Sequence, residues 1–434
     1  MLDRVDLRGE ADPLGRLPRP EPVPAASVAA VRAIVDAVRA EGDAAVARYT
    51  RQFDGAVPPT WRVAAADVTA ARARIDPELR EALEAAAESI DGFHRHRKPT
   101  THVHRRDGLV IRSWDQPVDR AGCYVPGGRA AYPSTVLMTA LPARAAGVDQ
   151  VAVCVPPGPD GRVADVTLAA AAVAGVHEVY AMGGAQAVAA MAYGTESVAA
   201  VDVIVGPGNV YVALAKQLVA GEVGVPAAFA GPSEIVVVAD GTTPAESAAI
   251  DLLVQAEHGP DGLAWLITWD EAAADAVEAS VAELLVSAAR REDIAATFAR
   301  SGHIVLVDGP EAAAEVVNGI APEHLQVMTA APEAVIERVR HAGAIFRGAW
   351  TPATLGDYVA GPSHVLPTSR TARFSGALGV RDFVKPMHEI TATPEGLAAV
   401  GPWAATMADA EGLDAHARSI RLRTRAQPDQ EHHP

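Results

Sequence analysis

The chain has 434 residues, 49% of them hydrophobic, and a formal net charge of −17 from 37 basic and 54 acidic side chains. This length predicts about two or three domains with cores of their own, and the acidic balance argues against nucleic-acid binding. The sequence contains neither an apolar signal segment nor a membrane span, and its two cysteines exclude a disulfide framework. We therefore expect a cytoplasmic protein with no membrane or nucleic-acid partner.

Helix-forming and strand-forming segments alternate through most of the chain. The first segments are two amphipathic helices at 27–41 and 76–97, and the second has an acidic first turn and a basic last turn. Short apolar strands then alternate with helices, and several of them end in glycines. These strands are predicted at 121–125, 151–155, 178–182, 201–205, 234–239, 263–269, 303–307, 325–329 and 344–346.

This alternation predicts an α/β protein with two Rossmann-like doubly wound domains and a small, mainly helical C-terminal appendage. The expected boundaries are an N-terminal segment at 1–20, a first Rossmann-like domain at 21–121 and 235–374, a second at 122–234, and the appendage at 375–434. Strands that end in glycines before a helix are typical of ligand-facing loops in open α/β sheets.

The dinucleotide fingerprint Gly-x-Gly-x-x-Gly is absent from the sequence. Its nearest match, Gly206-Pro-Gly208-Asn209-Val-Tyr211, lacks the third glycine. On this motif alone, a tight turn from strand to helix is favoured over a nucleotide site.

Four further segments contain residues that suit metal binding or proton transfer. Gln255 and His258 share one face of a helix end, and Glu323 and His324 are adjacent in a turn before a strand. Asp357 and His364 lie in a long loop rich in Gly and Pro, and Glu411 and His416 lie in the appendage. Taken one at a time, these residues also fit a helix terminus, a solvated surface pair or an exposed helix histidine.

Taken together, the segments resemble the histidinol dehydrogenase family, in order and over nearly the whole chain. The matching segments are Cys123-Tyr-Val-Pro-Gly-Gly128, Gly183-Gly-Ala-Gln186-Ala, Val205-Gly-Pro-Gly-Asn209, Ala230-Gly-Pro-Ser233-Glu, Gln255-Ala-Glu-His258, Ala321-Pro-Glu323-His324-Leu, Leu355-Gly-Asp357-Tyr, His364-Val-Leu-Pro-Thr368 and Glu411-Gly-Leu-Asp-Ala-His416.

The resemblance implies a zinc- and NAD-dependent enzyme that oxidises L-histidinol to L-histidine through L-histidinaldehyde and reduces two NAD. It implies a homodimer with shared active sites, in which the appendage serves dimerisation. One Zn²⁺ per subunit would be held by Gln255, His258, Asp357 and a His416 from the other subunit, an N/O set typical of catalytic zinc.

The resemblance also assigns the remaining roles. Glu323 and His324 would be the acid/base pair, and Tyr124, Gln186 and Asn209 would contact NAD. Substrate contacts would come from Ser233, Gln255, His258, His324, Asp357, His364, Glu411 and His416.

The sequence departs from the family pattern at Ala353, Ser363 and Gly259, where relatives often carry Glu, Asn and Asp. These departures leave open a dehydrogenase of the same fold that oxidises another small polar alcohol, such as a sulfonated diol. A non-catalytic dimer bridged by zinc is disfavoured, because it has no use for an acid/base pair.

Overall fold

A computed structural model describes residues 2–10, 12–18, 24–97, 100–127, 130–226, 233–257, 259 and 262–425. The chain divides into two compact units, described here in turn. The first contains Met1–Arg97 and Val118–Phe383, and the second contains Lys98–Pro117 and Val384–Pro434.

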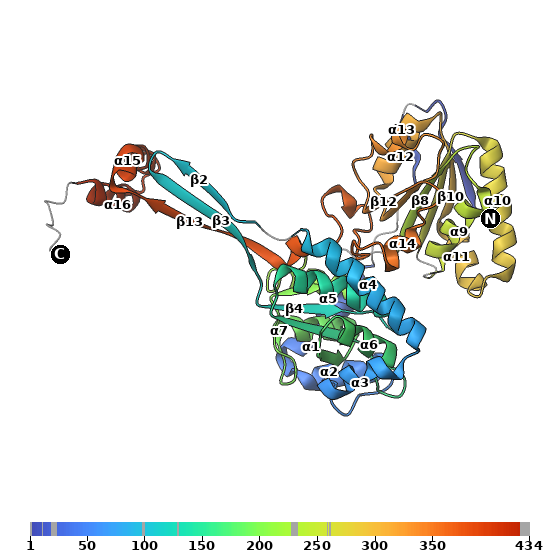
Figure 1. The fold of residues 1–434 in the computed structure, drawn as a ribbon, viewed down its shortest axis with the longest axis horizontal. Helices are drawn as coiled ribbons and strands as arrows, with labels where there is room; N and C mark the ends of the chain where they lie inside the picture. The colour runs from blue at the N-terminus through green and yellow to red at the C-terminus, as the bar shows by residue number, and fades with distance from the viewer. Residues whose placement is uncertain are drawn as a thin grey trace. The chain divides into compact units, whose positions relative to one another are not determined.

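The first unit contains a six-stranded parallel sheet in the order β1-β10-β9-β8-β11-β12. Helices α9, α10 and α11 cover one face, and α12 and α13 cover the other (Figure 1). Alternate residues of the central strands face the two helical layers, so β8 is buried on both sides. The bounds are β1 (Asp3–Asp6), β8 (Glu234–Ala239), β9 (Leu263–Thr268), β10 (Gly302–Leu306), β11 (His324–Val327), β12 (Ala344–Arg347), α9 (Ala245–Ala256), α10 (Glu271–Ser287), α11 (Arg291–Ser301), α12 (Pro310–Ile320), α13 (Glu333–Ile336) and, after β12, α14 (Ala353–Tyr358).

A four-stranded parallel sheet in the order β6-β5-β4-β7 forms the other core of this unit. Its strands and helices are β4 (Arg120–Tyr124), β5 (Gln150–Val155), β6 (Glu178–Ala181), β7 (Val203–Val205), α5 (Pro133–Ala146), α6 (Asp165–Val173), α7 (Gly184–Tyr193) and α8 (Val210–Val219).

Four N-terminal helices pack against the helices of this smaller sheet (Figure 1). They are α1 (Ala25–Glu41), α2 (Asp43–Phe53), α3 (Ala65–Arg74) and α4 (Pro77–Arg95). α1 and α2 contact α7, α3 contacts α6, and α4 contacts α5. The sequence analysis expected 21–121 to join 235–374 instead. The difference arises because an amphipathic pattern predicts which face of a helix is buried, but not which sheet it covers.

Both sheets contain a point where the direction of strand progression reverses, between β4 and β7 in the small sheet and between β8 and β11 in the large one. Ligands of open α/β sheets bind at the carboxyl ends of the strands at such a point. In the large sheet these ends are tied together, because Thr243 Oγ1 donates to the Met328 carbonyl (2.7 Å) and the Ala330 amide donates to Asp240 Oδ2 (2.9 Å).

The second unit is an antiparallel sheet in the order β13-β3-β2 with two helices at its end (Figure 1). Its elements are β2 (His102–Arg106), β3 (Leu109–Pro117), β13 (Val384–Ala392), α15 (Pro394–Ala410) and α16 (Asp414–Thr424). The sequence analysis predicted a mainly helical appendage but not β13, because side chains on both faces of that strand are largely exposed and show no alternation of apolar and polar residues.

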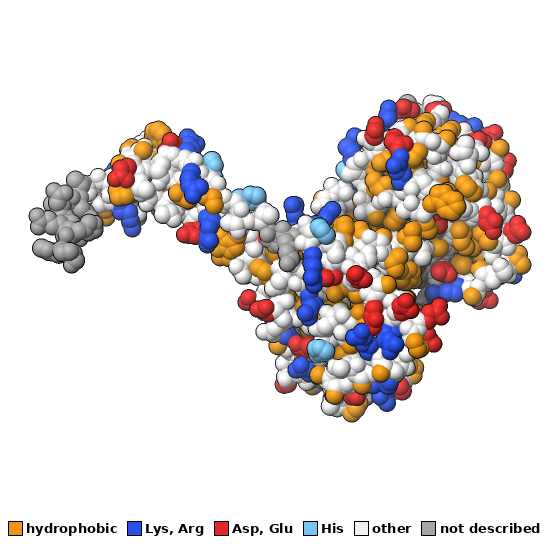
Figure 2. Space-filling model, viewed as in Figure 1, with side chains coloured by type: hydrophobic (Ala, Val, Ile, Leu, Met, Phe, Trp, Pro, Cys, Tyr) orange, Lys and Arg blue, Asp and Glu red, His pale blue; other side chains and the backbone are white. Residues whose placement is uncertain are grey.

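Large apolar side chains remain at the surface of the second unit. Trp403 and Met407 on α15 are 63% and 65% exposed, and Ile390 on β13 is 62% exposed. Figure 2 shows apolar side chains at the surface around α15 and α16. In the described part of the chain, no helix combines the length and apolar character needed to cross a bilayer.

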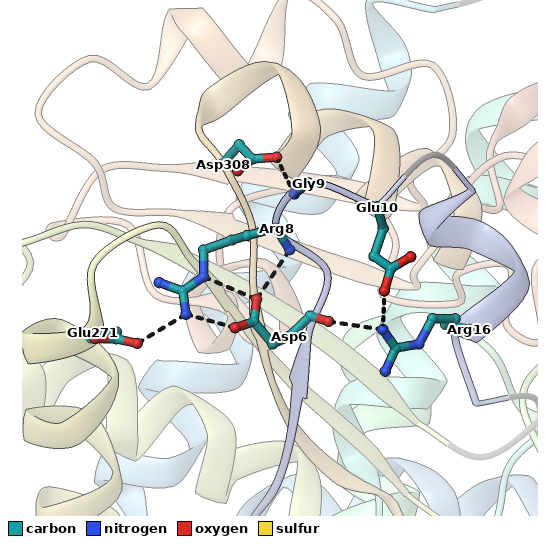
Figure 3. A network of polar contacts seen from close by, with 7 residues as sticks. All are labelled: Asp6, Arg8, Gly9, Glu10, Arg16, Glu271 and Asp308. Carbon is teal, nitrogen blue, oxygen red and sulfur yellow. Dashed lines mark hydrogen bonds and ion pairs between the residues drawn. The ribbon is translucent and has the colours of Figure 1, made fainter.

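The N-terminal strand β1 is the edge of the six-stranded sheet, where polar contacts hold it in place (Figure 3). Asp6 accepts a hydrogen bond from the Arg8 guanidinium. The same guanidinium donates to Glu271 Oε1 at the start of α10 (3.0 Å). The Gly9 amide donates to Asp308 Oδ2 (2.9 Å), just beyond β10. Glu271 on α10 and Asp308 after β10 therefore hold the residues that follow β1, and so keep this edge strand in the sheet.

A nearly buried ion pair ties together the strand starts of the smaller sheet. Arg120 on β4 binds Glu178 on β6 and donates to Gln150 Oε1 (2.8 Å), while the Tyr180 hydroxyl donates to Glu178 Oε1 (2.6 Å). The two charged side chains are 10% and 18% exposed. Each charge has lost most of its contact with water, and the opposite charge compensates for that loss.

We expect Arg120→Ala to lower the free energy of unfolding by about 3 kcal/mol, because it leaves the Glu178 carboxylate buried without its counter-charge. The measurement is urea unfolding followed by circular dichroism. Arg72→Ala is the matched control. It breaks an exposed pair with Glu84 and should cost roughly 0–1 kcal/mol. Equal losses in the two variants would contradict the prediction.

Candidate active site

Glu323 and His324 lie where the chain passes from α12 into β11. α12 ends at Ile320, Ala321 adopts a left-handed conformation (φ 52°), and Pro322 prevents the helix from continuing. Both side chains are buried, at 8% and 4% exposure. His324 Nδ1 lies 3.5 Å from Glu323 Oε2, so the structure brings the predicted acid/base pair together.

The main chain of Glu234, the first residue of β8, holds both members of this pair. Its amide donates to Glu323 Oε2 (3.0 Å), and its carbonyl lies 3.2 Å from His324 Nδ1. Because a carbonyl only accepts hydrogen bonds, Nδ1 carries a proton in this contact. Nε2 then faces Asp357 Oδ1, 3.2 Å away. The ring also stacks on Phe346, with 5.9 Å between ring centroids.

Two opposing effects act on the titration of this cluster. Burial alone would lower the pKa of His324, but the negative charges of Glu323 and Asp357 outweigh it and raise the pKa to about 10. Burial, and then the charge of Glu323, raise the pKa of the Glu234 carboxyl to about 8. Glu234 is therefore mainly protonated at neutral pH.

Gln255 lies in the last turn of α9 and is 1% exposed. Its amide nitrogen is 3.5 Å from His324 Nδ1, a weak contact, and its carbonyl oxygen Oε1 has no hydrogen-bond partner within the described chain. A buried acceptor without a donor is costly unless a ligand satisfies it, and a cation next to Asp357 would do so. His258, the other ligand predicted on this segment, lies outside the described residues.

His364 connects this cluster to the smaller sheet. Its Nδ1 donates to the Asp357 carbonyl (2.8 Å), and its Nε2 lies 3.2 Å from Thr135 Oγ1 at the start of α5. Burial lowers the pKa of His364, so the ring is neutral and its Nε2 accepts from Thr135. Ser233 is half-buried immediately before Glu234. The predicted substrate-contacting positions Asp357 and His364 thus lie beside the acid/base pair, and Ser233 precedes the residue that holds it.

The three predicted cofactor residues lie around the carboxyl ends of the small sheet. Tyr124 ends β4, and its hydroxyl accepts from the Gly184 amide at the start of α7 (3.1 Å). Gln186 is buried, and neither polar atom of its side chain has a partner within the described chain. Asn209 caps α8 by accepting from the amides of its second and third residues.

Gly206 lets the ends of β4 and β7 approach each other. Its φ is +107°, and a Cβ there would lie 2.0 Å from the Tyr124 carbonyl oxygen. Only glycine fits this position. The tight turn predicted from Gly206-Pro-Gly208 is therefore present, and it lies at the switch point, where a nucleotide is expected.

Glu411 and His416 belong to the second unit. Glu411 follows the last residue of α15, His416 lies on α16, and both are exposed. Among the described residues, no group of three or more His, Cys, Asp or Glu side chains forms a metal site. The proposed zinc set is not such a group, since it contains the amide of Gln255, the undescribed His258 and a histidine of the separate unit.

Comparisons with known proteins decide the family. The family model for histidinol dehydrogenase matches residues 18–424. A histidinol dehydrogenase of Rhodospirillum rubrum is 50% identical over 91% of this chain and 91% of its own, and one of Parasynechococcus marenigrum is 48% identical over 91% and 90%. The crystal structure of a histidinol dehydrogenase from Elizabethkingia anophelis superposes with a TM-score of 0.92 at 32% identity, over 97% of this chain and 98% of its own.

The chain belongs to the histidinol dehydrogenase family. Membership confirms the resemblance read from the sequence and makes the chain an NAD-dependent oxidoreductase of the histidine biosynthetic family. It also confirms the predicted α/β fold with parallel sheets and C-terminal helices.

Sequence reasoning missed three residues that shape this candidate site: Glu234, Thr135 and Phe346. Glu234 could have been recognised from the sequence, because it is an acidic residue followed by five apolar strand residues. A buried acidic residue needs a polar partner. Nothing in the sequence around Thr135 and Phe346 points to a role in the site. Their roles arise from contacts between segments more than 20 residues apart in the chain.

Proposed function

We propose that the chain catalyses the last step of histidine biosynthesis, the oxidation of L-histidinol to L-histidine through L-histidinaldehyde, with two NAD reduced in turn. One observation carries the proposal: a buried Glu323–His324 pair, locked by the Glu234 main chain, in a chain of the histidinol dehydrogenase family.

The two residues divide the proton chemistry between them. His324 Nε2 accepts the hydroxyl proton of histidinol while hydride leaves the carbinol carbon for the first NAD. The ring must be neutral for this step, and a cation held by Asp357 would lower the His324 pKa by offsetting the carboxylate charge that raises it. Glu323 takes a proton from water, which adds to the aldehyde and gives the hydrate. A second hydride transfer from the hydrate to NAD yields the carboxylic acid. The sum is one alcohol, one water and two NAD⁺ converted to one carboxylate, two NADH and three protons.

Zn²⁺, one per subunit, would be held by Gln255, His258, Asp357 and His416 of the partner subunit. The unpartnered Gln255 Oε1 and the Asp357 carboxylate, which both belong to side chains in contact with His324, are oxygen donors that suit such an ion. When bound, it would supply Lewis-acid charge that orients and polarises the substrate. Substrate contacts are proposed for Ser233, Gln255, His258, His324, Asp357, His364, Glu411 and His416.

NAD is proposed to bind at the carboxyl ends of β4 and β7, in contact with Tyr124, Gln186 and Asn209. The unsatisfied Gln186 amide supports this placement, since buried donors and acceptors without chain partners are normally met by a ligand or water. No glycine fingerprint is needed at a switch point where Gly206 already allows the close approach.

The homodimer with shared active sites is proposed from the second unit. Its exposed apolar residues Ile390, Trp403 and Met407 suit burial against a second copy of the chain. A cytoplasmic location is proposed from the two free, buried cysteines, which fit a reducing compartment.

The decisive experiment measures NADH produced per histidinol consumed by the purified protein, together with its zinc content. We expect two NADH per histidinol, one zinc per subunit, and loss of turnover after a chelator removes the metal, with recovery when zinc is restored. The matched substrate control is a sulfonated diol. Turnover of that diol without turnover of histidinol would overturn the proposed substrate, and full activity without metal would overturn the zinc site.

A further inference from the structure

Glu234 occupies a position that neither the acid/base pair nor the substrate residues explain. It is 2% exposed, begins β8, and lies between β11, which carries His324, and the loop that follows His364. We propose that Glu234 is a positioning residue for the oxidation. Its main chain holds the Glu323 carboxylate and the His324 ring, and its side chain anchors that main chain to the substrate loop. This inference rests on the proposed function of Glu323 and His324.

The main-chain contacts set the geometry of both reacting groups. The Glu234 amide fixes Glu323 Oε2 at 3.0 Å, and the Glu234 carbonyl fixes the protonated Nδ1 of His324 at 3.2 Å. The first contact orients the carboxylate, and the second leaves Nε2 as the proton acceptor. A shift of this one peptide segment would misplace both groups at once.

Any residue at this position would have the same amide and carbonyl, so the side chain must explain why a glutamate stands here. The Ser369 amide donates to Glu234 Oε1 (2.8 Å), and the Glu323 amide faces the same carboxyl. Ser369 and Arg370 both adopt left-handed backbone conformations, with φ values of 53° and 67°. Such a turn costs free energy unless its surroundings hold it, and the Glu234 carboxyl supplies that contact.

The same loop carries His364, five residues before Ser369. The Glu234 side chain therefore links the catalytic pair to the segment that is proposed to bind substrate. Oε2 accepts no hydrogen bond within the described chain, so one acceptor oxygen is enough for the anchoring role. A glutamine has the same length, keeps that acceptor and carries no charge.

Three substitutions separate the reach and the acceptor oxygen needed for anchoring from the carboxyl group itself. Glu234→Gln should keep kcat for histidinol within about threefold of wild type. Glu234→Asp keeps the carboxyl group but is one methylene too short to reach Ser369, and it should lower kcat about 10-fold. Glu234→Leu removes the acceptor and should lower kcat about 100-fold, with KM for NAD within about twofold because Tyr124, Gln186 and Asn209 are untouched.

Gln326→Leu is the matched control, since it replaces another fully buried polar side chain two residues after His324 on β11. We expect its kcat to stay within about threefold of wild type, even where its melting temperature falls. If Glu234→Leu does not fold, the order of the glutamine and aspartate variants still decides. A kcat for Glu234→Asp above that of Glu234→Gln would overturn the inference, as would a Glu234→Leu no slower than Gln326→Leu. A wild-type protein inactive with histidinol would instead overturn the proposed function.

Discussion

Replacement of His324 with asparagine is expected to lower kcat for histidinol oxidation by about 10²–10⁴-fold, the usual contribution of a positioned general base. The amide is close to imidazole in shape and can still donate to the Glu234 carbonyl, but it has no basic nitrogen at the Nε2 position, 3.2 Å from Asp357. NADH formation followed at 340 nm under saturating NAD and histidinol measures the effect. Binding of NAD should be unchanged, because the residues proposed to contact NAD lie at the small sheet and not beside His324.

Glu323→Gln provides the matched comparison for this experiment. If Glu323 activates the water that hydrates the aldehyde, the first hydride transfer survives better than the second. The NADH yield in a single turnover should then fall from two toward one per histidinol, with aldehyde accumulating. A His324→Asn variant with wild-type kcat would show that the pair is not catalytic, and equal loss of both half-reactions in Glu323→Gln would remove the assigned division of roles.

The sequence was sufficient to predict most strands of the two parallel sheets and the residue types of the site. β8, β11 and α9 form regular elements because apolar runs of strand or helix length leave few alternatives. Glu323 and His324 were recognised from their motif, and the structure shows why they occur as adjacent residues. The left-handed Ala321 and the following Pro322 end α12, so the next two side chains enter the start of a buried strand.

The sequence could not predict contacts that depend on how elements meet. α1 through α4 have apolar faces that fit either sheet, and only packing against α5, α6 and α7 selects the small one. Strand β13 escaped detection because a ribbon exposed on both faces has no period-two pattern. Glu234 was part of a quoted motif, yet its role depends on Ser369, which is 135 residues away. The spacing of Gln255 was consistent with an ordinary helix end until its unpartnered carbonyl oxygen was seen beside His324.

Mixing two inactive variants is expected to restore activity if His416 acts across the dimer. His324→Asn removes the proposed base, and His416→Asn removes the proposed ligand from the other unit of the chain. In a mixed dimer, one site combines both defects, while the other combines a normal His324 with a normal His416 of the partner subunit. Mixed dimers isolated through two different affinity tags should therefore show roughly half of the wild-type kcat, from a background close to zero in each homodimer.

The control pairs His324→Asn with Asp357→Asn, two residues that the structure places 3.2 Å apart in the same unit of the chain. Each site of that mixed dimer retains one defect, so no activity should return. The exposed position of His416 on α16 makes its substitution mild for folding, which circular dichroism of the homodimer checks.

Zinc per dimer should be close to zero in the His416→Asn homodimer and about one in the His324→Asn/His416→Asn mixture, if losing one ligand abolishes binding. Recovery in neither mixture would place His416 in the site of its own subunit, and a fully active His416→Asn homodimer would place it outside the site. Recovery in both would show that the defects complement by some route other than a shared zinc.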